Sequence, residues 1–245
     1  MANEYLVNSA DLTAVADAIR AKGGKSEALV FPSGFVSAVQ AIQSGGSASG
    51  LTDLELLIQD KLEVFSSNIT TLPGIYEFCG KKNLKKVSMP LASGYVTQYA
   101  FQNSGITEVE MPKTTSVGGS AFYGCLSLPR VTFPLCVEVQ TNGFNWCGNL
   151  EKADLGSSDI TEVKNLGASA FQNTPALKAL ILRYSVVIPL LNSNIFGTDS
   201  GITTGIGHVY VPSALIPEYQ AATNWATLYA NYPEIFQPIE GSVYE

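Results

Sequence analysis

The side chains able to carry out chemistry in this chain are few, and their spacing assembles no catalytic centre. The sequence has a single histidine, His208, which stands beside Val209 in a predicted strand with its side chain directed outward. A Ser-His-Asp or Cys-His arrangement would have to use that histidine. The aspartates and glutamates are scattered, and no two are spaced as a recognisable acid–base pair. We therefore expect a protein without enzymatic activity.

The motifs of metal and cofactor sites are also missing. Zinc sites use three or four protein ligands, and the four cysteines form no Cys-x-x-Cys pair. Asn192, Asn194 and Asp199 are too loosely spaced for a calcium loop. Gly205 and Gly207 do not belong to a Gly-x-Gly-x-x-Gly segment between a strand and a helix. We expect neither a bound metal nor a cofactor.

Two of the cysteines occupy equivalent positions in a repeated pattern. Cys125 and Cys147 each follow a phenylalanine by three residues, and Ser104 and Thr174 fill that position elsewhere. A position that accepts Cys, Ser or Thr is typical of a small, buried turn. We expect free thiols in the core; a disulfide between adjacent repeats and metal binding are the alternatives.

Composition and charge exclude further classes of function. The chain has 245 residues, of which 46% are hydrophobic and 14% charged, which predicts a folded protein. Its net charge is -7, and it lacks the broad basic surface expected of a nucleic-acid-binding protein. The sequence contains no run of about 18 apolar residues, so no membrane span is predicted. The N-terminal residues show neither the positive nor the apolar region of a signal peptide, so we expect no secretory leader.

A recurring pattern of phenylalanine and aliphatic residues predicts the fold. A phenylalanine is followed in each copy by Leu/Ile-x-x-apolar-x-apolar, and the copies begin at Phe78, Phe101, Phe122, Phe144, Phe171 and Phe196. A period of roughly 20–29 residues with this pattern is typical of a leucine-rich-repeat solenoid. A second apolar stretch, clearest at 117–122, predicts two short strands per repeat. We expect a mainly β, right-handed solenoid from about residue 51 to 245.

The N-terminal residues 1–43 are predicted to form a separate helical module. Two short helices each show one apolar face, and a unit of this size cannot bury both faces by itself. We expect this surface to attach to another protein or to form a dimer or trimer; its residues are Leu12, Val15, Ile19, Phe35, Val39 and Ile42. Residues 44–50 are a Gly/Ser linker by composition.

Both ends of the solenoid are expected to carry caps, because a terminal repeat otherwise exposes its apolar surface. The N-terminal cap is predicted at 51–68 and the C-terminal cap at 213–245. Helical character begins at Ser213, the predicted N-cap, and Pro233 ends it. Phe236 and Ile239 are predicted to fold back on the last repeat.

A row of side chains on the predicted strands forms the candidate binding face. These residues flank the buried position of each strand, and their charges alternate in sign; they are Lys86, Ser88, Glu108, Glu110, Arg130, Thr132, Lys152, Asp154, Ala179, Ile181, His208 and Tyr210. One interpretation is a solubilising surface, and the other is recognition of a protein or glycan, since solenoids commonly bind through extended surfaces. Ile181 and Tyr210 give its most apolar part. The inserts at 156–167 and 183–205 are an alternative binding surface.

The repeats resemble a known family. Residues 120–134 read Ser-Ala-Phe-Tyr-Gly-Cys-Leu-Ser-Leu-Pro-Arg-Val-Thr-Phe-Pro and resemble BspA-type leucine-rich repeats, whose units read approximately xAFxxCxxLxxVxLPxxVxxIG. The resemblance covers about 66–212, and residues 209–225 resemble the usual end of such arrays. Gly156 and Arg183 depart from it at the proline position. The resemblance implies a solenoid that binds a partner.

The N-terminal module resembles a different group of proteins. Residues 5–24 and 31–35 look like an N-terminal module of phage and prophage structural proteins from Gram-positive gut bacteria. This resemblance implies a virion protein of the head or tail, assembled in the bacterial cytoplasm and released by lysis. It would contact other virion proteins through 1–43 and a host-surface protein or glycan through the solenoid. The alternative is a bacterial cell-surface or secreted adhesin of the BspA kind.

Overall fold

Two compact units make up the chain, Met1–Gln59 and Asp60–Glu245. The structure, a computed structural model, describes residues 56–245 except 58, 73 and 75. The predicted N-terminal helices, their attachment face and the linker 44–50 lie outside the described residues. Strands β1–β12 and helices α4 and α5 all belong to the second unit, which we call the repeat stack.

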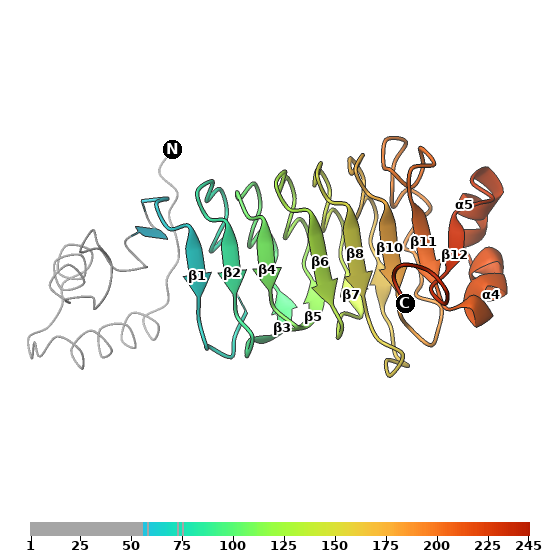
Figure 1. The fold of residues 1–245 in the computed structure, drawn as a ribbon, viewed down its shortest axis with the longest axis horizontal. Coiled ribbons are helices and arrows are strands. Elements are labelled where there is room, and N and C mark those ends of the chain that lie inside the picture. Colours follow the sequence, from blue (N-terminus) through green and yellow to red (C-terminus); the bar gives the residue numbers. More distant parts are fainter. Residues whose placement is uncertain (1–55, 58, 73, 75) are drawn as a thin grey trace, which may run out of the picture. The chain divides into compact units, whose positions relative to one another are not determined.

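One side of the repeat stack, the strand face, is built from two parallel sheets in line (Figure 1). The first has the order β1-β2-β4 and the second the order β12-β11-β10-β8-β6. Neighbouring strands pair so that equivalent residues lie side by side, as Val87 does with Val109. The strands are β1 Val64–Ser66, β2 Lys86–Ser88, β4 Glu108–Glu110, β6 Arg130–Phe133, β8 Lys152–Leu155, β10 Ala179–Leu182, β11 His208–Val211 and β12 Phe236–Pro238.

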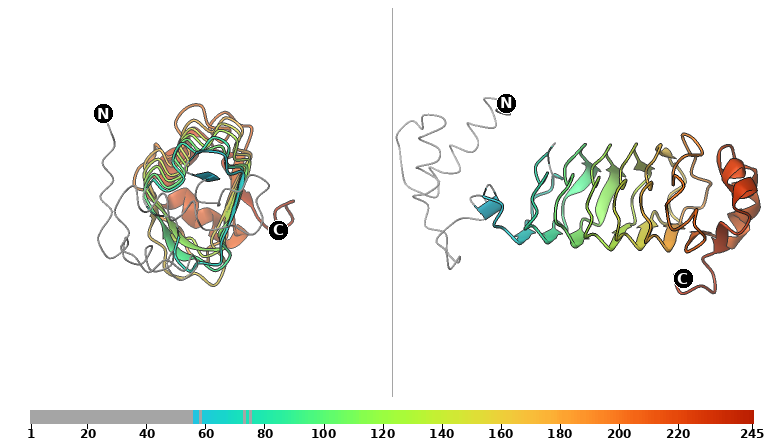
Figure 2. Two further views of the ribbon diagram at one scale, coloured as in Figure 1. Left: turned by 90° about the vertical axis from the view of Figure 1, so that its left-hand side faces the viewer. Right: turned by 90° about the horizontal axis from the view of Figure 1, so that it is seen from above.

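A third parallel sheet runs along another side of the repeat stack. Its strands, in the order β3-β5-β7-β9, are β3 Ser93–Val96, β5 Lys113–Val117, β7 Glu138–Val139 and β9 Asn165–Leu166. Viewed along the stack, the successive repeats superpose around a shared interior (Figure 2). The prediction of a mainly β chain with two short strands per repeat is confirmed for these repeats. Within Asp60–Glu245 the structure has two short α-helices, α4 and α5, both at the C-terminal end.

The repeated phenylalanines form a continuous column in the core. The rings of Phe101 and Phe122 stack with centroids 5.0 Å apart, and those of Phe122 and Phe144 with centroids 5.1 Å apart. Phe78 and Phe171 extend the column at 5.1 and 5.4 Å. All of these rings are buried. Each repeat therefore buries its phenylalanine only because the next repeat stacks on it.

One departure from the repeat pattern has a steric cause. Gly156 stands where most repeats have proline, and its φ is +77°. A Cβ at this position would lie 2.1 Å from the ring of Tyr184. Tyr184 is buried, and its hydroxyl donates to the carbonyl of Cys136 at 2.8 Å. The glycine thus makes room for a tyrosine that a later insert brings into the core.

The C-terminal cap consists of a 3₁₀ turn, η1 Ser213–Leu215, and helices α4 Ile216–Ala221 and α5 Trp225–Asn231. Tyr219 and Trp225 are buried against the last repeat, and Trp225 Nε1 donates to the carbonyl of Ile188 at 2.8 Å. The predicted N-cap role of Ser213 is wrong. Pro212 precedes the turn, there is no side-chain cap, and the Ser213 amide donates to Glu240 Oε2 at 2.9 Å. The predicted return of the chain onto the last repeat is confirmed by the pairing of β12 with β11.

The strand face is interrupted between β4 and β6, and Pro129 is the cause. In the neighbouring repeats the equivalent amides donate backward, from Thr107 to Lys85 O at 2.7 Å and from Glu151 to Pro129 O at 2.8 Å. Proline has no amide hydrogen to donate. No backbone hydrogen bond joins β4 to β6 in this part of the described chain, and the two strands stand apart in Figure 1. We call this interruption the seam. Val109 is partly exposed there, although its counterparts in the flanking repeats are buried.

Candidate binding face

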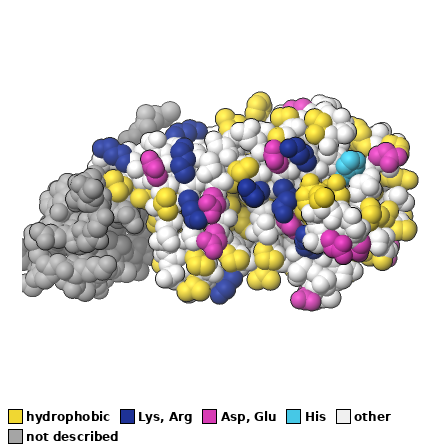
Figure 3. Space-filling view, in the orientation of Figure 1, with side chains coloured by type: hydrophobic (Ala, Val, Ile, Leu, Met, Phe, Trp, Pro, Cys, Tyr) yellow, Lys and Arg dark blue, Asp and Glu magenta, His cyan; other side chains and the backbone are white. Residues whose placement is uncertain are grey.

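Most of the residues predicted to form a binding face are accessible on the strand face. Glu108, Glu110, Arg130 and Thr132 are exposed. Lys86, Lys152, His208 and Tyr210 are partly exposed. The orientation of Figure 3 is that of Figure 1, and Lys and Arg side chains are spread over the visible face with Asp and Glu side chains among them. The parallel register brings these residues together, because it aligns one position of each repeat with the same position of the next.

The apolar end of the predicted face is covered by the chain itself. Ala179 and Ile181 are fully buried, and they form a cluster with Ile239 against which Tyr210 and Tyr244 pack. The prediction that Ile181 is open to a partner is therefore wrong. The cause is the segment after β12, which returns across β10 and β11 and buries side chains that would otherwise be an exposed apolar patch.

An ion pair anchors this C-terminal segment. Arg183 donates to the two carboxylate oxygens of Asp154 at 2.8 and 3.2 Å, and its Nη2 also donates to the carbonyl of Tyr244 at 2.6 Å. Lys152 lies 3.4 Å from the same carboxylate. Asp154 is buried, so it is a structural group and not the open binding residue that was predicted.

The acidic part of the face is already paired within the protein. Lys86 Nζ donates to Glu108 at 2.5 Å, and this hydrogen bond raises the pKa of Lys86. Ser88 is buried, so its prediction as an open binding residue is wrong, and its hydroxyl donates to Glu110 Oε2 at 2.6 Å. These carboxylates have partners before any ligand arrives.

Arg130 differs from its neighbours. It is exposed at the centre of the strand face, and its side chain makes no hydrogen bond or ion pair with any described residue. The nearby lysines are paired, Lys152 with Asp154 and Lys178 with Glu151 at 2.9 Å. A guanidinium has five donors in a planar fork that matches a carboxylate or phosphate. Arg130 therefore presents its full donor set to solvent.

Two adjoining hollows meet at Arg130. One, of about 440 Å³, lies in the seam, and its walls are Thr107, Glu108, Val109, Pro129, Arg130 and Thr132. The other, of about 280 Å³, lies over the next strands and is lined by Pro129, Arg130, Glu151, Lys152, Lys178 and Tyr244. Both are lined by Pro129 and Arg130, so they adjoin at these residues, and we call the two hollows together the Arg130 groove.

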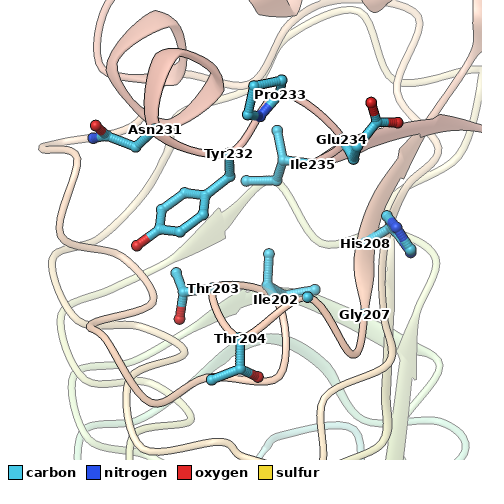
Figure 4. Close-up of a pocket in the computed structure, with 11 residues that line it drawn as sticks. Ile202, Thr203, Thr204, Gly207, His208, Asn231, Tyr232, Pro233, Glu234 and Ile235 are labelled. Carbon is cyan, nitrogen blue, oxygen red and sulfur yellow. The ribbon is translucent and has the colours of Figure 1, made fainter.

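A separate hollow of about 530 Å³ lies at the C-terminal end of the stack. Ile202 and Ile235 lie between Thr203, Thr204 and Tyr232 on one side and His208 and Glu234 on the other (Figure 4). No lysine or arginine lines it. His208 was predicted to be an outward-facing strand residue, and it borders this hollow from β11.

The buried cysteines have no reactive environment. Burial raises the pKa of Cys125 and Cys136 to about 12, and it raises that of Cys147 well above the ordinary value. The Cys125 thiol donates to the carbonyl of Phe101 at 3.0 Å, and the Cys147 thiol donates to that of Phe122 at 3.0 Å. These thiols are part of the core, as predicted for Cys125 and Cys147. A thiolate is the nucleophilic form, and it is disfavoured there.

Neither a metal-ligand cluster nor a membrane-spanning helix occurs in the described part of the chain. Among its residues, no group of three or more His, Cys, Asp or Glu side chains is placed to hold a metal ion. No helix in the described ranges is long and apolar enough to cross a membrane.

Sequence reasoning missed two contributors to the groove. No role was predicted for Pro129, although a proline immediately before a strand signals a lost ladder hydrogen bond. Tyr244 is 61 residues beyond Arg183, which holds its carbonyl. No local pattern indicates that contact.

The comparisons with known proteins address the fold. A family model described as BspA type leucine rich repeat region matches residues 71–202 in six copies. The chain also resembles the solved structure titled "The Crystal structure of Pneumococcal vaccine antigen PcpA", with a TM-score of 0.54 and 17% sequence identity. That similarity covers 74% of this chain and 42% of the other, so the chain spans less than half of that protein's length. No curated protein matches the sequence.

Proposed function

We propose that this chain, which belongs to the BspA-type leucine-rich repeat family, is a non-enzymatic binding protein whose strand face recognises a polymer on a bacterial host surface. In this proposal the repeat stack is a right-handed solenoid that displays the face. The ligand is a surface protein or glycan, and the Arg130 groove is its main contact.

The observation that carries the proposal is the unpaired arginine in the groove. The other accessible charges on the face, such as Lys86, Glu108 and Lys178, are held by partners within the protein. A solubilising face needs no hollow and no unpaired guanidinium at its centre. A concave site with a few convergent polar groups is the usual form of a binding site.

Blocking the groove tests this proposal. Thr132 is exposed in β6 and lines the seam, so Thr132→Trp should fill the hollow while leaving the core intact. Thr141 is exposed and lines none of the hollows described above, so Thr141→Trp is the matched control. We expect the fluorescently labelled full chain to bind host bacteria, Thr132→Trp to bind at least about tenfold more weakly, and the control to bind normally. Equal binding by the two variants would rule out the groove as the recognition site.

We further propose that the protein is virion-associated and that residues 1–43 attach it to other virion proteins. The support is the resemblance of this segment to phage and prophage structural proteins and its two apolar sequence faces. Assembly in the cytoplasm and release by lysis would place the repeat stack outside the cell.

Attachment can be tested in the full chain. Replacing Ile19 and Val39 by Asp should lower recovery on purified particles and lower the oligomeric state measured by light scattering, because both changes put a charge on a predicted contact face. Glu4→Gln, a substitution outside these faces, is the control. If the doubly substituted protein loads onto particles like the control, residues 1–43 are not the anchor.

A second candidate is a bacterial cell-surface adhesin. One of the solved structures that it resembles is described as a pneumococcal vaccine antigen, which favours display on a cell rather than on a virion. Immunogold labelling of intact producing cells and of purified particles separates the two settings. The proposed use of the strand face is the same in both.

A further inference from the structure

We infer that the ligand of the Arg130 groove is an acidic polysaccharide, with its acid group at Arg130 and Lys152 and its hydroxyl groups in the seam. This inference rests on the proposed function, since it names the chemical class recognised by the same face. Three properties of the groove lead to it: its local charge, its free backbone groups and its lack of apolar anchors.

The part of the groove over β6 and β8 has a local charge opposite to that of the chain, and Glu108, the acid in the seam, is paired with Lys86. The hollow over β6 and β8 has three cations, Arg130, Lys152 and Lys178, and one acid, Glu151, whereas the chain as a whole carries -7. Lys178 and Glu151 neutralise each other at 2.9 Å. Arg130 and Lys152 are direct neighbours across the β6–β8 pair. Asp154, which lies 3.4 Å from Lys152, is already neutralised by Arg183, so the charges of Arg130 and Lys152 can act together on one bound anion.

The seam adds backbone groups to this constellation. In neighbouring repeats the equivalent amides, Glu108 N and Lys152 N, donate to carbonyls of the preceding repeat at 3.0 and 3.3 Å. The Arg130 amide makes no such bond, because β6 is not paired with β4. The carbonyl of Thr107, which would receive it, likewise has no bond from β6. A donor and an acceptor are thus left open to solvent on facing strands, where hydroxyl groups of a sugar can bind both.

The walls of the groove do not suit a protein partner. Protein interfaces depend on large apolar or aromatic anchors at their centre. The exposed large hydrophobic side chains of the described residues, such as Leu126 and Trp146, are absent from the groove lining. The lining consists instead of threonines, a proline, charged side chains, the small and only partly exposed Val109, and Tyr244, which is partly covered. Such walls match a hydrated, charged polymer.

The test measures binding of the full chain to three immobilised polymers. Polygalacturonate is the acidic polysaccharide, dextran is the neutral polysaccharide, and poly-glutamate is the acidic peptide. We expect binding to polygalacturonate that weakens steeply between about 0.05 M and about 0.5 M salt, since both charges of the groove are accessible to solvent. Binding to dextran and to poly-glutamate should be at least about tenfold weaker.

The variants isolate the groove from the net charge. Arg130→Gln should weaken binding to polygalacturonate about tenfold or more, because it removes the guanidinium, whose two parallel N–H groups can donate to one carboxylate. Its melting temperature should not change, since Arg130 is exposed and unpaired. Lys113→Gln removes the same charge from an exposed position of β5, in the other sheet, and should leave binding unchanged.

Several results would overturn the inference. They are equal binding to dextran, equal binding to poly-glutamate, and an equal effect of the Arg130 and Lys113 substitutions. Failure of the inference is distinguishable from failure of the proposed function. If host bacteria bind the chain through the groove but polygalacturonate does not bind, only the ligand class is wrong. If polygalacturonate binds at Arg130 but no host bacterium does, the inference holds and the proposed function fails.

Discussion

Replacing Phe122 by Ala should destabilise the repeat stack more than any ordinary surface change. The ring is fully buried and stacks between Phe101 at 5.0 Å and Phe144 at 5.1 Å, and Phe133 lies 6.1 Å away. Removing it leaves a cavity between two repeats that are held apart by their own backbone ladders, so the site cannot collapse. Buried Phe→Ala changes cost about 3–5 kcal/mol, and we expect a value near the middle, about 4 kcal/mol.

This loss is large enough to measure by thermal unfolding. For a unit of this size, about 1 kcal/mol shifts the melting temperature by about 2–4 °C, so the expected fall is about 8–16 °C by circular dichroism. Leu126→Ala is the matched control, because Leu126 lies in the same repeat but its side chain is 54% exposed. Its melting temperature should change by about 2 °C or less. If Phe122→Ala melts within about 2 °C of the unmodified chain, the phenylalanine column does not hold the repeats together.

Three more changes test other parts of the structure. Gly156→Ala should lower the melting temperature much more than Gly205→Ala. Both glycines have positive φ, but only at Gly156 would the added Cβ meet a buried ring, at 2.1 Å from Tyr184. Equal losses would mean that backbone strain alone is responsible. The contribution of Cys125 and Cys136 to stability should be fully present below about pH 9 and be lost as the pH rises towards 12, because burial raises their folded-state pKa values to about 12 from 9.0. Urea titrations between about pH 8 and about pH 11 should therefore show a fall in stability, and a flat profile over that range would contradict it. Arg183→Met should leave Asp154 without its main partner, lower the melting temperature and release the C-terminal segment to proteolysis; an unchanged cleavage pattern would contradict the anchoring role.

The repeat architecture could be predicted from the sequence because each copy specifies the same local arrangement. The buried positions follow the spacing of Phe122, Leu128 and Val131 in most repeats, and all three are buried. The exceptions are Val109, partly exposed at the seam, and Ile206, exposed in the last copy. Parallel stacking then aligns equivalent positions, which is why the row containing Glu108 and Arg130 could be placed on one face from the sequence alone.

The errors come from contacts between distant segments. Ile181 has the alternating position of an exposed strand residue, and only the return of Ile239 and Tyr244 buries it. Asp154 is buried for a related reason, since Arg183 comes from the end of the next repeat. These contacts depend on the path of the chain outside the regular repeats, and the repeat pattern in the sequence does not predict that path.

The seam was within reach of sequence reasoning. The strand-preceding position is occupied by Thr107, Glu151 and Lys178 in other repeats, and all of these have an amide to donate. Pro129, which occupies the same position before β6, has no amide hydrogen to donate. Treating the proline as a missing donor, and not only as a repeat residue, predicts an interrupted sheet and therefore a place where backbone groups meet solvent.

The most direct test of the central claim is a lysine footprint of the full chain bound to isolated host cell envelopes. Lys178 on the strand face and Lys164 beside β9 are matched, since both are ion-paired to a glutamate and their side chains are 53% and 62% exposed. Acetylation followed by mass spectrometry should show Lys178 and Lys152 protected by the bound envelope while Lys164 stays reactive. Protection of Lys164 with Lys178 and Lys152 still reactive would show that recognition takes place away from the strand face.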